Sequence, residues 1–210
     1  MPPISQALVE AFTEKAGLVA AKVTEAASMS QALLRVVEIC EKKSPCELLA
    51  PEEGTETGPL SENKLPTRVQ RIIAAPDLDD KDFAALEKAC KKKGFLCVRN
   101  GLRKYLAGID VGLVQSGLGV AASGSCVVDS SDEEIRLASM ICEESVIVLP
   151  KSAIRPDLAS IAGDLREMQS SGEARYTAFI TGPSRTADIE RVLALGVHGP
   201  LELHIILLEG

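Results

Sequence analysis

The sequence has few aromatic side chains. It contains no tryptophan, two tyrosines and four phenylalanines, so a hydrophobic core has to be built mainly from Leu, Ile, Val and Ala. Proteins that bind single-stranded nucleic acid stack the bases on aromatic side chains, and two tyrosines and four phenylalanines are few for a stacking surface. The net charge of -7 also argues against a broad surface for nucleic acid or anionic lipid. We therefore expect no nucleic-acid partner.

Closely spaced cysteines are absent as well. The six cysteines include no C-x-x-C pair, whereas zinc ribbons and iron–sulfur clusters use closely spaced thiolates. With only two histidines, His198 and His204, we expect no bound metal and no cofactor on this chain. Cys90, Cys126 and Cys142 lie among apolar or small residues and are expected to be buried as small hydrophobic side chains.

Long apolar runs and targeting signals are missing too. No apolar run approaches the about 18 residues that a membrane-spanning helix requires. The first five residues lack the basic and apolar regions of a signal peptide. We therefore expect a cytoplasmic protein with no membrane span, and in that compartment a framework of disulfides is not expected.

Several nucleotide-binding and catalytic motifs are absent. Gly117, Gly119 and Gly124 resemble a dinucleotide-binding fingerprint only superficially, because the spacing to the third glycine is wrong and no helix follows. The chain has no Walker-type phosphate loop and no G-x-S-x-G nucleophile elbow, and two histidines leave little room for a Ser-His-Asp triad. These absences argue against a dinucleotide site and against a serine hydrolase.

Three segments of the chain differ in composition. Residues 1–43 are expected to form a helical arm of two helices with no strand, because apolar residues recur there at helical spacing. Residues 44–66, rich in Pro, Gly and Glu, are expected to be a linker, with a brief contact at 46–49. Residues 67–210 are expected to form an α/β domain. The arm packs on the rest of the chain or on a partner, which leaves a homo-oligomer open.

The α/β domain alternates strand-like and helical patterns. Predicted strands at 69–74 and 95–98 flank a helix at 79–93, which indicates a β-α-β unit with parallel strands. A glycine turn at 123–125 predicts an antiparallel hairpin. The sum is a three-layer, open, mixed sheet with helices on both faces. The remaining predicted elements are helices at 102–106, 132–142 and 156–169 and strands at 118–122, 126–128, 146–149, 176–180 and 203–208.

The densest group of polar residues is the stretch 182–190, GPSRTADIE, which follows a predicted strand. In α/β sheets, ligands bind beyond the carboxyl ends of strands. Arg185 offers a forked cation suited to carboxylate or phosphate, and the neighbouring hydroxyl groups offer donors. Alternatively, the hydroxyls cap a turn and Asp188 pairs with Arg185 internally. The candidate ligand-binding residues here are Gly182, Ser184, Arg185, Thr186 and Asp188.

Two further loops are candidates. His198 lies in a glycine-rich turn, where a histidine can serve as general acid or base; a hydrogen-bonded turn residue is the alternative. Glu202 would orient it, whereas His204 alternates with apolar residues in a predicted strand and is interpreted as structural. The loop Ser123, Gly124 and Ser125 would line an anion site through its backbone N–H groups, although a hairpin turn alone also explains it.

The stretches 182–190 and 196–204 (GVHGPLELH) together resemble the LUD-domain family, and within it the lactate utilization protein C branch. Looser similarity extends back through 146–150 to about residue 68. The resemblance implies a fold like that of sugar-phosphate isomerases and coenzyme A transferases. It also implies a role in oxidising L-lactate to pyruvate beside iron–sulfur partner proteins, which carry the clusters, while this chain carries none.

The hairpin loop departs from the family pattern. The family commonly places an acidic residue before Thr-Gly-Thr at the hairpin, whereas residues 122–126 here read ASGSC. Ala122 stands in place of the carboxylate, and serines replace both threonines. A role that requires this carboxylate is therefore not expected of this chain.

Two functions follow as hypotheses. The first is a subunit of a lactate utilization system that binds a small anion or a partner protein through the 182–190 loop. The second is an enzyme like the isomerases or acyl transferases, acting on a phosphorylated or carboxylated small molecule. In that case Arg185 would anchor the substrate and His198 would move protons.

Overall fold

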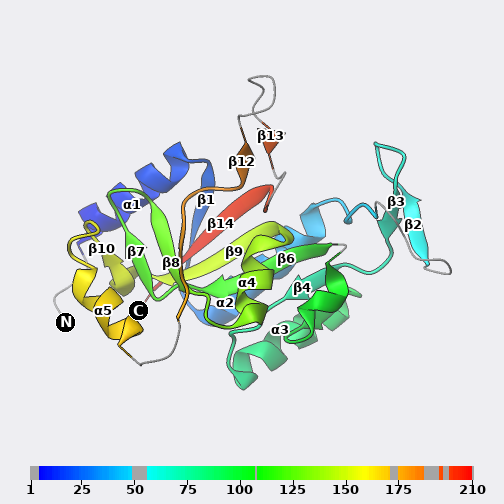
Figure 1. Ribbon diagram of the computed structural model, residues 1–210. Coiled ribbons are helices and arrows are strands. Elements are labelled where there is room, and N and C mark those ends of the chain that lie inside the picture. The colour runs from blue at the N-terminus through cyan, green and yellow to red at the C-terminus, as the bar shows by residue number, and fades with distance from the viewer. Residues whose placement is uncertain are drawn as a thin grey trace.

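The computed structural model describes residues 5–48, 56–106, 108–170, 175–186, 194–195 and 199–209. Its centre is a six-stranded sheet in which every neighbouring pair is parallel (Figure 1). Strands buried on both faces suit a parallel sheet, and all but the last residue of β6 are buried. In spatial order the strands are β1 (Ala21–Ala26), β14 (Glu202–Leu208), β9 (Cys142–Pro150), β6 (Ile109–Gln115), β4 (Ile72–Ala74) and β5 (Leu96–Val98).

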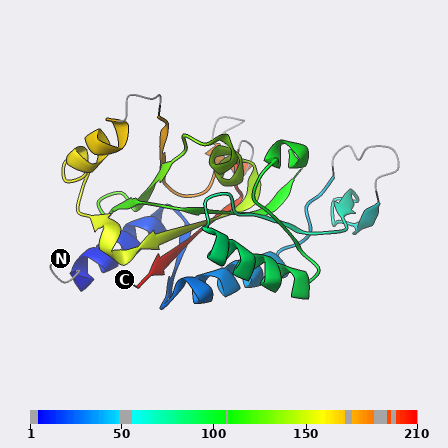
Figure 2. The same cartoon turned by 90° about the horizontal axis from the view of Figure 1, so that it is seen from below.

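Helices cover both faces of this sheet. On one face, α2 (Met29–Lys42) and α3 (Asp80–Lys92) bury their apolar residues against β4, β6, β9 and β14 (Figure 2). On the other face, α1 (Gln6–Leu18) and α4 (Glu133–Met140) share a core with the central strands and with a second sheet. The predicted open α/β fold with helices on both faces is confirmed.

The second sheet has four strands and carries the predicted hairpin. Strands β7 and β8 pair antiparallel, as the glycine turn predicts, but they lie outside the central sheet. Helix α5 (Ala162–Gln169) packs on this sheet through Leu165 and Met168. In spatial order the strands are β10 (Ile154–Arg155), β7 (Leu118–Val120), β8 (Ser125–Asp129) and β11 (Thr177–Ile180).

Shorter elements complete the described part of the chain. Two antiparallel pairs stand apart from both sheets, and two single turns of 3-10 helix connect strands. The pairs are β2 (Thr57–Leu60) with β3 (Pro66–Arg68) and β12 (Arg185–Thr186) with β13 (Ala194–Leu195); the 3-10 turns are η1 (Leu102–Tyr105) and η2 (Lys151–Ala153).

Side-chain caps explain where several helices begin. Asp79 accepts from the backbone N–H of Asp82 at the start of α3, and Asp132 accepts from that of Glu134 at the start of α4. The helices predicted at 79–93 and 132–142 are therefore confirmed to within a few residues. The helix predicted from residue 156 begins only at Ala162, because Asp157 and Ser160 exchange hydrogen bonds that form a local turn instead.

The N-terminal segment contains a strand, so the expectation of two helices with no strand is wrong. Strand β1 pairs in register with β14, from Ala21 opposite Leu203 to Ala26 opposite Leu208. As the edge strand it buries only its two end residues, Ala21 and Ala26, so it lacks the alternation that identifies a strand in a sequence. The division into an arm, a linker and an α/β domain stays a prediction, and so does a homo-oligomer built through the N-terminal helices.

The Pro- and Gly-rich segment makes a contact at 46–48, within the predicted stretch 46–49; residue 49 lies outside the described residues. Cys46 and Leu48 are buried. The N–H of Leu48 donates to the carbonyl of Pro66, and the N–H of Arg68 donates to the carbonyl of Cys46. These bonds hold the start of the segment against β3.

All six cysteines are free thiols within the described residues, and only Cys97 is partly exposed. Burial raises the pKa of Cys40, Cys126 and Cys142 to about 12. Thiolates are the reactive form of cysteine, so these three thiols are unreactive. The predicted burial of Cys90, Cys126 and Cys142 as small hydrophobic side chains is confirmed.

We expect a thiol reagent to modify Cys97 alone in the native protein. The measurement is the number of thiols that react with a chromogenic disulfide, before and after unfolding in guanidinium. One fast equivalent that disappears in Cys97→Ser supports the burial pattern. Several fast equivalents in the folded protein would contradict it.

No helix among the described residues combines the length and the apolar character that crossing a bilayer demands.

Candidate functional site

A cavity of about 420 Å³ lies between α4, β11 and the two loops that precede β12 and β14. Most of its wall is apolar, with hydroxyl groups and one arginine. No carboxylate, histidine or cysteine is among the described residues that line it. Cavities of this size and character are typical of small-molecule sites. The polar lining residues are Ser130, Arg136, Ser139, Ser145, Tyr176, Thr177, Thr181 and Ser184.

The two loops that the sequence singled out meet beside this cavity. Ser125 Oγ lies 2.7 Å from Ser123 Oγ and 2.6 Å from Thr181 Oγ1. The hydroxyls of the hairpin therefore form a chain that ends next to the 182–190 stretch. Because Ser125 is buried and its hydroxyl is already partnered, this chain joins the two loops. A ligand role for Ser123, Gly124 and Ser125 stays a prediction.

Gly182 is needed where the 182–190 stretch begins. Its φ is +73°, and a Cβ there would overlap the carbonyl oxygen of Val19 at the end of α1. Only glycine adopts this conformation without strain and allows so close an approach. Gly182 also lines the cavity, as does Ser184, whose N–H donates to the carbonyl of Pro200 at 2.9 Å.

Arg185 lies elsewhere than the sequence suggested. It belongs to β12 opposite Leu195, it is exposed, and it is not among the residues that line the cavity. Thr186 pairs with Ala194 in the same hairpin. Asp188 and His198 lie outside the described residues, so their roles as ligand and as general acid or base stay predictions.

The cation of the cavity is Arg136, which sequence reasoning missed. Its Nη1 donates to the carbonyls of Ser130 and Ser131, and its guanidinium lies 5.2 Å from the centre of the Tyr176 ring. Among the described residues, no hydrogen-bond partner faces its Nε or Nη2. A single arginine in an amphipathic helix belongs to no motif, so no sequence signal identifies it.

Ser145 is the second feature of the cavity without a sequence signal. It lies in β9 with only 1% of its surface exposed, and its Oγ has no hydrogen-bond partner among the described residues. The thiol of Cys142, whose pKa is raised by burial, is near enough to interact with this hydroxyl, but a thiol is a weak hydrogen-bonding group. A buried hydroxyl without a partner costs free energy, so Ser145 would gain from a polar ligand.

Glu202 and His204 form a different group. The carboxylate of Glu202 contacts Lys22 and the Nε2 of His204. That Glu202 orients His198 stays a prediction, because His198 lies outside the described residues. His204 also lies 3.3 Å from Glu144. This group lies beside α2, away from the cavity of Arg136.

Comparison with known proteins agrees with the fold and the motifs. The sequence matches the LUD domain over residues 9–208. It is 38% identical to the uncharacterized protein YkgG of Escherichia coli K12 over 47% of this chain and 44% of that protein. It is 35% identical to lactate utilization protein C of Shouchella clausii over 48% of this chain and 44% of that protein. These matches span less than half the length of each relative.

A solved structure shows the same fold. The crystal structure of a DUF162 family protein from Deinococcus radiodurans superposes with a TM-score of 0.57 at 16% identity, covering 99% of this chain and 100% of that one. The family match extends over nearly the whole sequence and includes both the β1 segment and the 182–190 stretch. The chain therefore belongs to the LUD domain family.

Proposed function

We propose that the chain serves in lactate utilization and binds a small carboxylate in the cavity beside Arg136. Relatives named lactate utilization protein C support the general role. The observation that carries the binding site is the free edge of the Arg136 guanidinium in a cavity whose described lining has no carboxylate.

The chemistry of the cavity suits a short hydroxy or keto acid. A guanidinium presents parallel N–H donors that match the two oxygens of a carboxylate. The unpartnered Ser145 hydroxyl would pair with a second oxygen of the ligand. The apolar wall from Ala178, Ile180 and Leu203 would contact its carbon atoms. L-lactate and pyruvate have this combination of groups.

Binding is proposed rather than catalysis at this site. Isomerase or acyl-transfer chemistry needs a general base or a nucleophile. Among the described residues of the cavity the candidate nucleophiles are hydroxyl groups, and no histidine, cysteine or carboxylate lies there to activate one. The enzyme hypothesis therefore has no support from the described lining.

Replacing Arg136 with glutamine is expected to weaken the binding of L-lactate or pyruvate by about tenfold to a hundredfold. Hydrogen bonds to a charged group contribute roughly 1.5–3 kcal/mol, and every 1.4 kcal/mol is about tenfold in affinity. Isothermal titration calorimetry measures the dissociation constants. Arg136→Lys keeps the positive charge but loses the paired N–H donors of the guanidinium. Its affinity should therefore lie between those of the wild type and of Arg136→Gln.

Arg185→Gln is the matched control. It removes the same kind of cation from the exposed hairpin, and we expect the affinity to change less than twofold. The opposite result, with Arg185→Gln losing the ligand and Arg136→Gln keeping it, would place the site on the loop that the sequence suggested. Failure of the wild-type protein to bind either acid would refute the cavity proposal.

We further propose that iron–sulfur proteins are the partners and hold the clusters. The six cysteines of this chain occur in separate elements, and no group of three converges in the described structure. The test is co-purification of the tagged chain with iron–sulfur proteins of the same organism grown on lactate. No association, together with normal growth on lactate after deletion, would contradict the role.

A further inference from the structure

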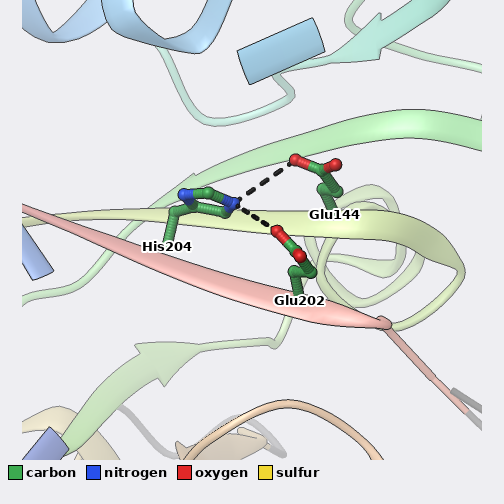
Figure 3. Close-up of side chains that lie close together, drawn as sticks. All are labelled: Glu144, Glu202 and His204. Carbon is green, nitrogen blue, oxygen red and sulfur yellow. Dashed lines mark hydrogen bonds and ion pairs between the residues drawn. The ribbon is translucent and has the colours of Figure 1, made fainter. Parts of the chain in front are cut away.

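Three side chains from neighbouring strands converge at the amino ends of β14 and β9. Glu202 is the first residue of β14, and His204 lies two residues further on the same face, because strand side chains alternate. Glu144 of β9 is the register partner of Glu202. Figure 3 shows the imidazole of His204 pointing between the two carboxylates.

The spacing of the donor atoms matches a metal site. His204 Nε2 lies 3.2 Å from Glu202 Oε2 and 3.3 Å from Glu144 Oε2, and all three ligand atoms lie within 4.8 Å of one another. Tetrahedral ligands bound at 2.0–2.2 Å are separated by about 3.3–3.6 Å. The distances from His204 to the two carboxylates lie close to the lower end of this range.

Contacts among Glu144, Glu202 and His204 do not use all the hydrogen-bonding capacity of the three side chains. His204 and Glu144 side chains are each 13% exposed, and among the described residues the only ion-pair partner of Glu144 is His204. A single Nε2–H cannot make a good hydrogen bond to both carboxylates at once.

The group also opens into a cavity of about 480 Å³ between the sheet and α2. Remaining coordination positions would therefore face water or a small ligand. Arg35 lines this cavity, and its buried Nε has no hydrogen-bond partner among the described residues. An ordered water or a ligand oxygen would satisfy such a donor.

We propose that Glu144, Glu202 and His204 bind a divalent first-row transition-metal ion, with Zn²⁺ the best match. One imidazole nitrogen and two carboxylate oxygens are ligands that Zn²⁺ accepts, whereas Mg²⁺ prefers oxygen ligands alone. Two glutamates neutralise the charge of the ion. The proposal does not rest on the carboxylate site of Arg136, and it departs from the expectation of no metal that the cysteine and histidine spacing produced.

Lys22 competes with a metal ion for the carboxylate of Glu202. Its ammonium group pairs with the Glu202 oxygen that faces His204, and its side chain is 55% exposed. A metal ion at the site would displace it into solvent. Because an exposed ion pair is weak, the competition is modest, and removing Lys22 should tighten metal binding about two- to fivefold.

The test is calorimetric titration of the chelator-treated full chain with Zn²⁺, followed by Mg²⁺ at the same concentration. We expect one Zn²⁺ per chain and no response to Mg²⁺. His204→Asn and Glu144→Gln should each weaken Zn²⁺ binding at least about a hundredfold, because even outer-shell partners are worth 10–100-fold. Lys22→Ala should bind more tightly than wild type.

Glu38→Gln is the matched control. Glu38 lines the same cavity but lies on α2, outside the three-residue group, so its loss should leave the Zn²⁺ affinity within twofold. If Glu38→Gln weakens Zn²⁺ binding as much as Glu144→Gln does, or if Mg²⁺ binds as tightly as Zn²⁺, the cation is attracted only by the general negative charge of the cavity. Either result would overturn the proposal.

Co²⁺ substitution supplies a readout that does not depend on the variants. The proposed ligands predict d–d absorption without the thiolate charge-transfer band that cysteine ligation adds. A thiolate band, or wild-type protein that binds no Zn²⁺, would also overturn the proposal. Circular dichroism confirms that each variant is folded before its affinity is compared.

Discussion

Replacing Gly112 with alanine is expected to destabilise the protein by about 3 kcal/mol or more. Gly112 lies in the middle of β6, where α4 crosses the sheet. A Cβ there would overlap the carbonyl oxygen of Ala138 and lie 2.7 Å from its carbonyl carbon and 2.9 Å from Cys142 Sγ. Backbone atoms cannot turn away as a side chain does, so α4 would have to move off the sheet. Equilibrium unfolding in urea measures the change in the free energy of unfolding.

Gly17 and Gly163 are matched controls for this experiment. Both lie in helices, and a Cβ at either position would meet no atom within 4 Å. Alanine is a better helix former than glycine by up to about 1 kcal/mol, so these variants should be neutral or slightly more stable. A loss at Gly112 no larger than the effect at Gly163 would show that α4 does not contact β6 this closely.

Replacing Asp110 with asparagine is expected to cost about 3–5 kcal/mol of stability. Asp110 has no exposed surface, and its carboxylate accepts from Lys43 Nζ at 2.9 Å, from the N–H of Cys46 at 3.3 Å and from the N–H of Ile72 at 2.8 Å. The amide of asparagine would direct N–H groups at donors and leave the buried Lys43 ammonium with Glu143 as its remaining acidic partner. Urea unfolding again supplies the measurement.

Glu41→Gln is the corresponding surface change. It removes the partner of Lys93 from a pair in which both side chains are about half exposed, and such pairs contribute roughly 0–1 kcal/mol. We therefore expect a shift several times smaller than that of Asp110→Asn. Similar losses for the two variants would mean that water reaches Asp110 and that its charge is not buried.

Both changes test contacts that join distant segments. Asp110 connects the end of α2, the residues after it, β6 and β4, while Gly112 sets the distance between β6 and α4. Neither position stands out in the sequence, because the atoms that surround it come from other parts of the chain. Their importance arises from packing rather than from local pattern.

The sequence predicts those features whose cause is local. Helix α3 follows from its Asp79 cap and apolar spacing, and the hairpin of β7 and β8 follows from a glycine turn between apolar runs. Alternation of these elements indicates the α/β class. Strand β1 was missed because an edge strand with exposed side chains has little pattern of its own; its pairing with β14 comes from opposite ends of the chain.

For the candidate sites, the sequence by itself determined the hairpin loop at Ser123–Ser125 and the family to which the chain belongs. Only the tertiary structure decided that Arg136 rather than Arg185 lies in the cavity, and that Glu144, Glu202 and His204 meet across β9 and β14. Backbone turns depend on the conformational limits of a few consecutive residues. Cavities and ligand groups depend on which strands pair, and parallel pairing joins residues that no sequence spacing connects.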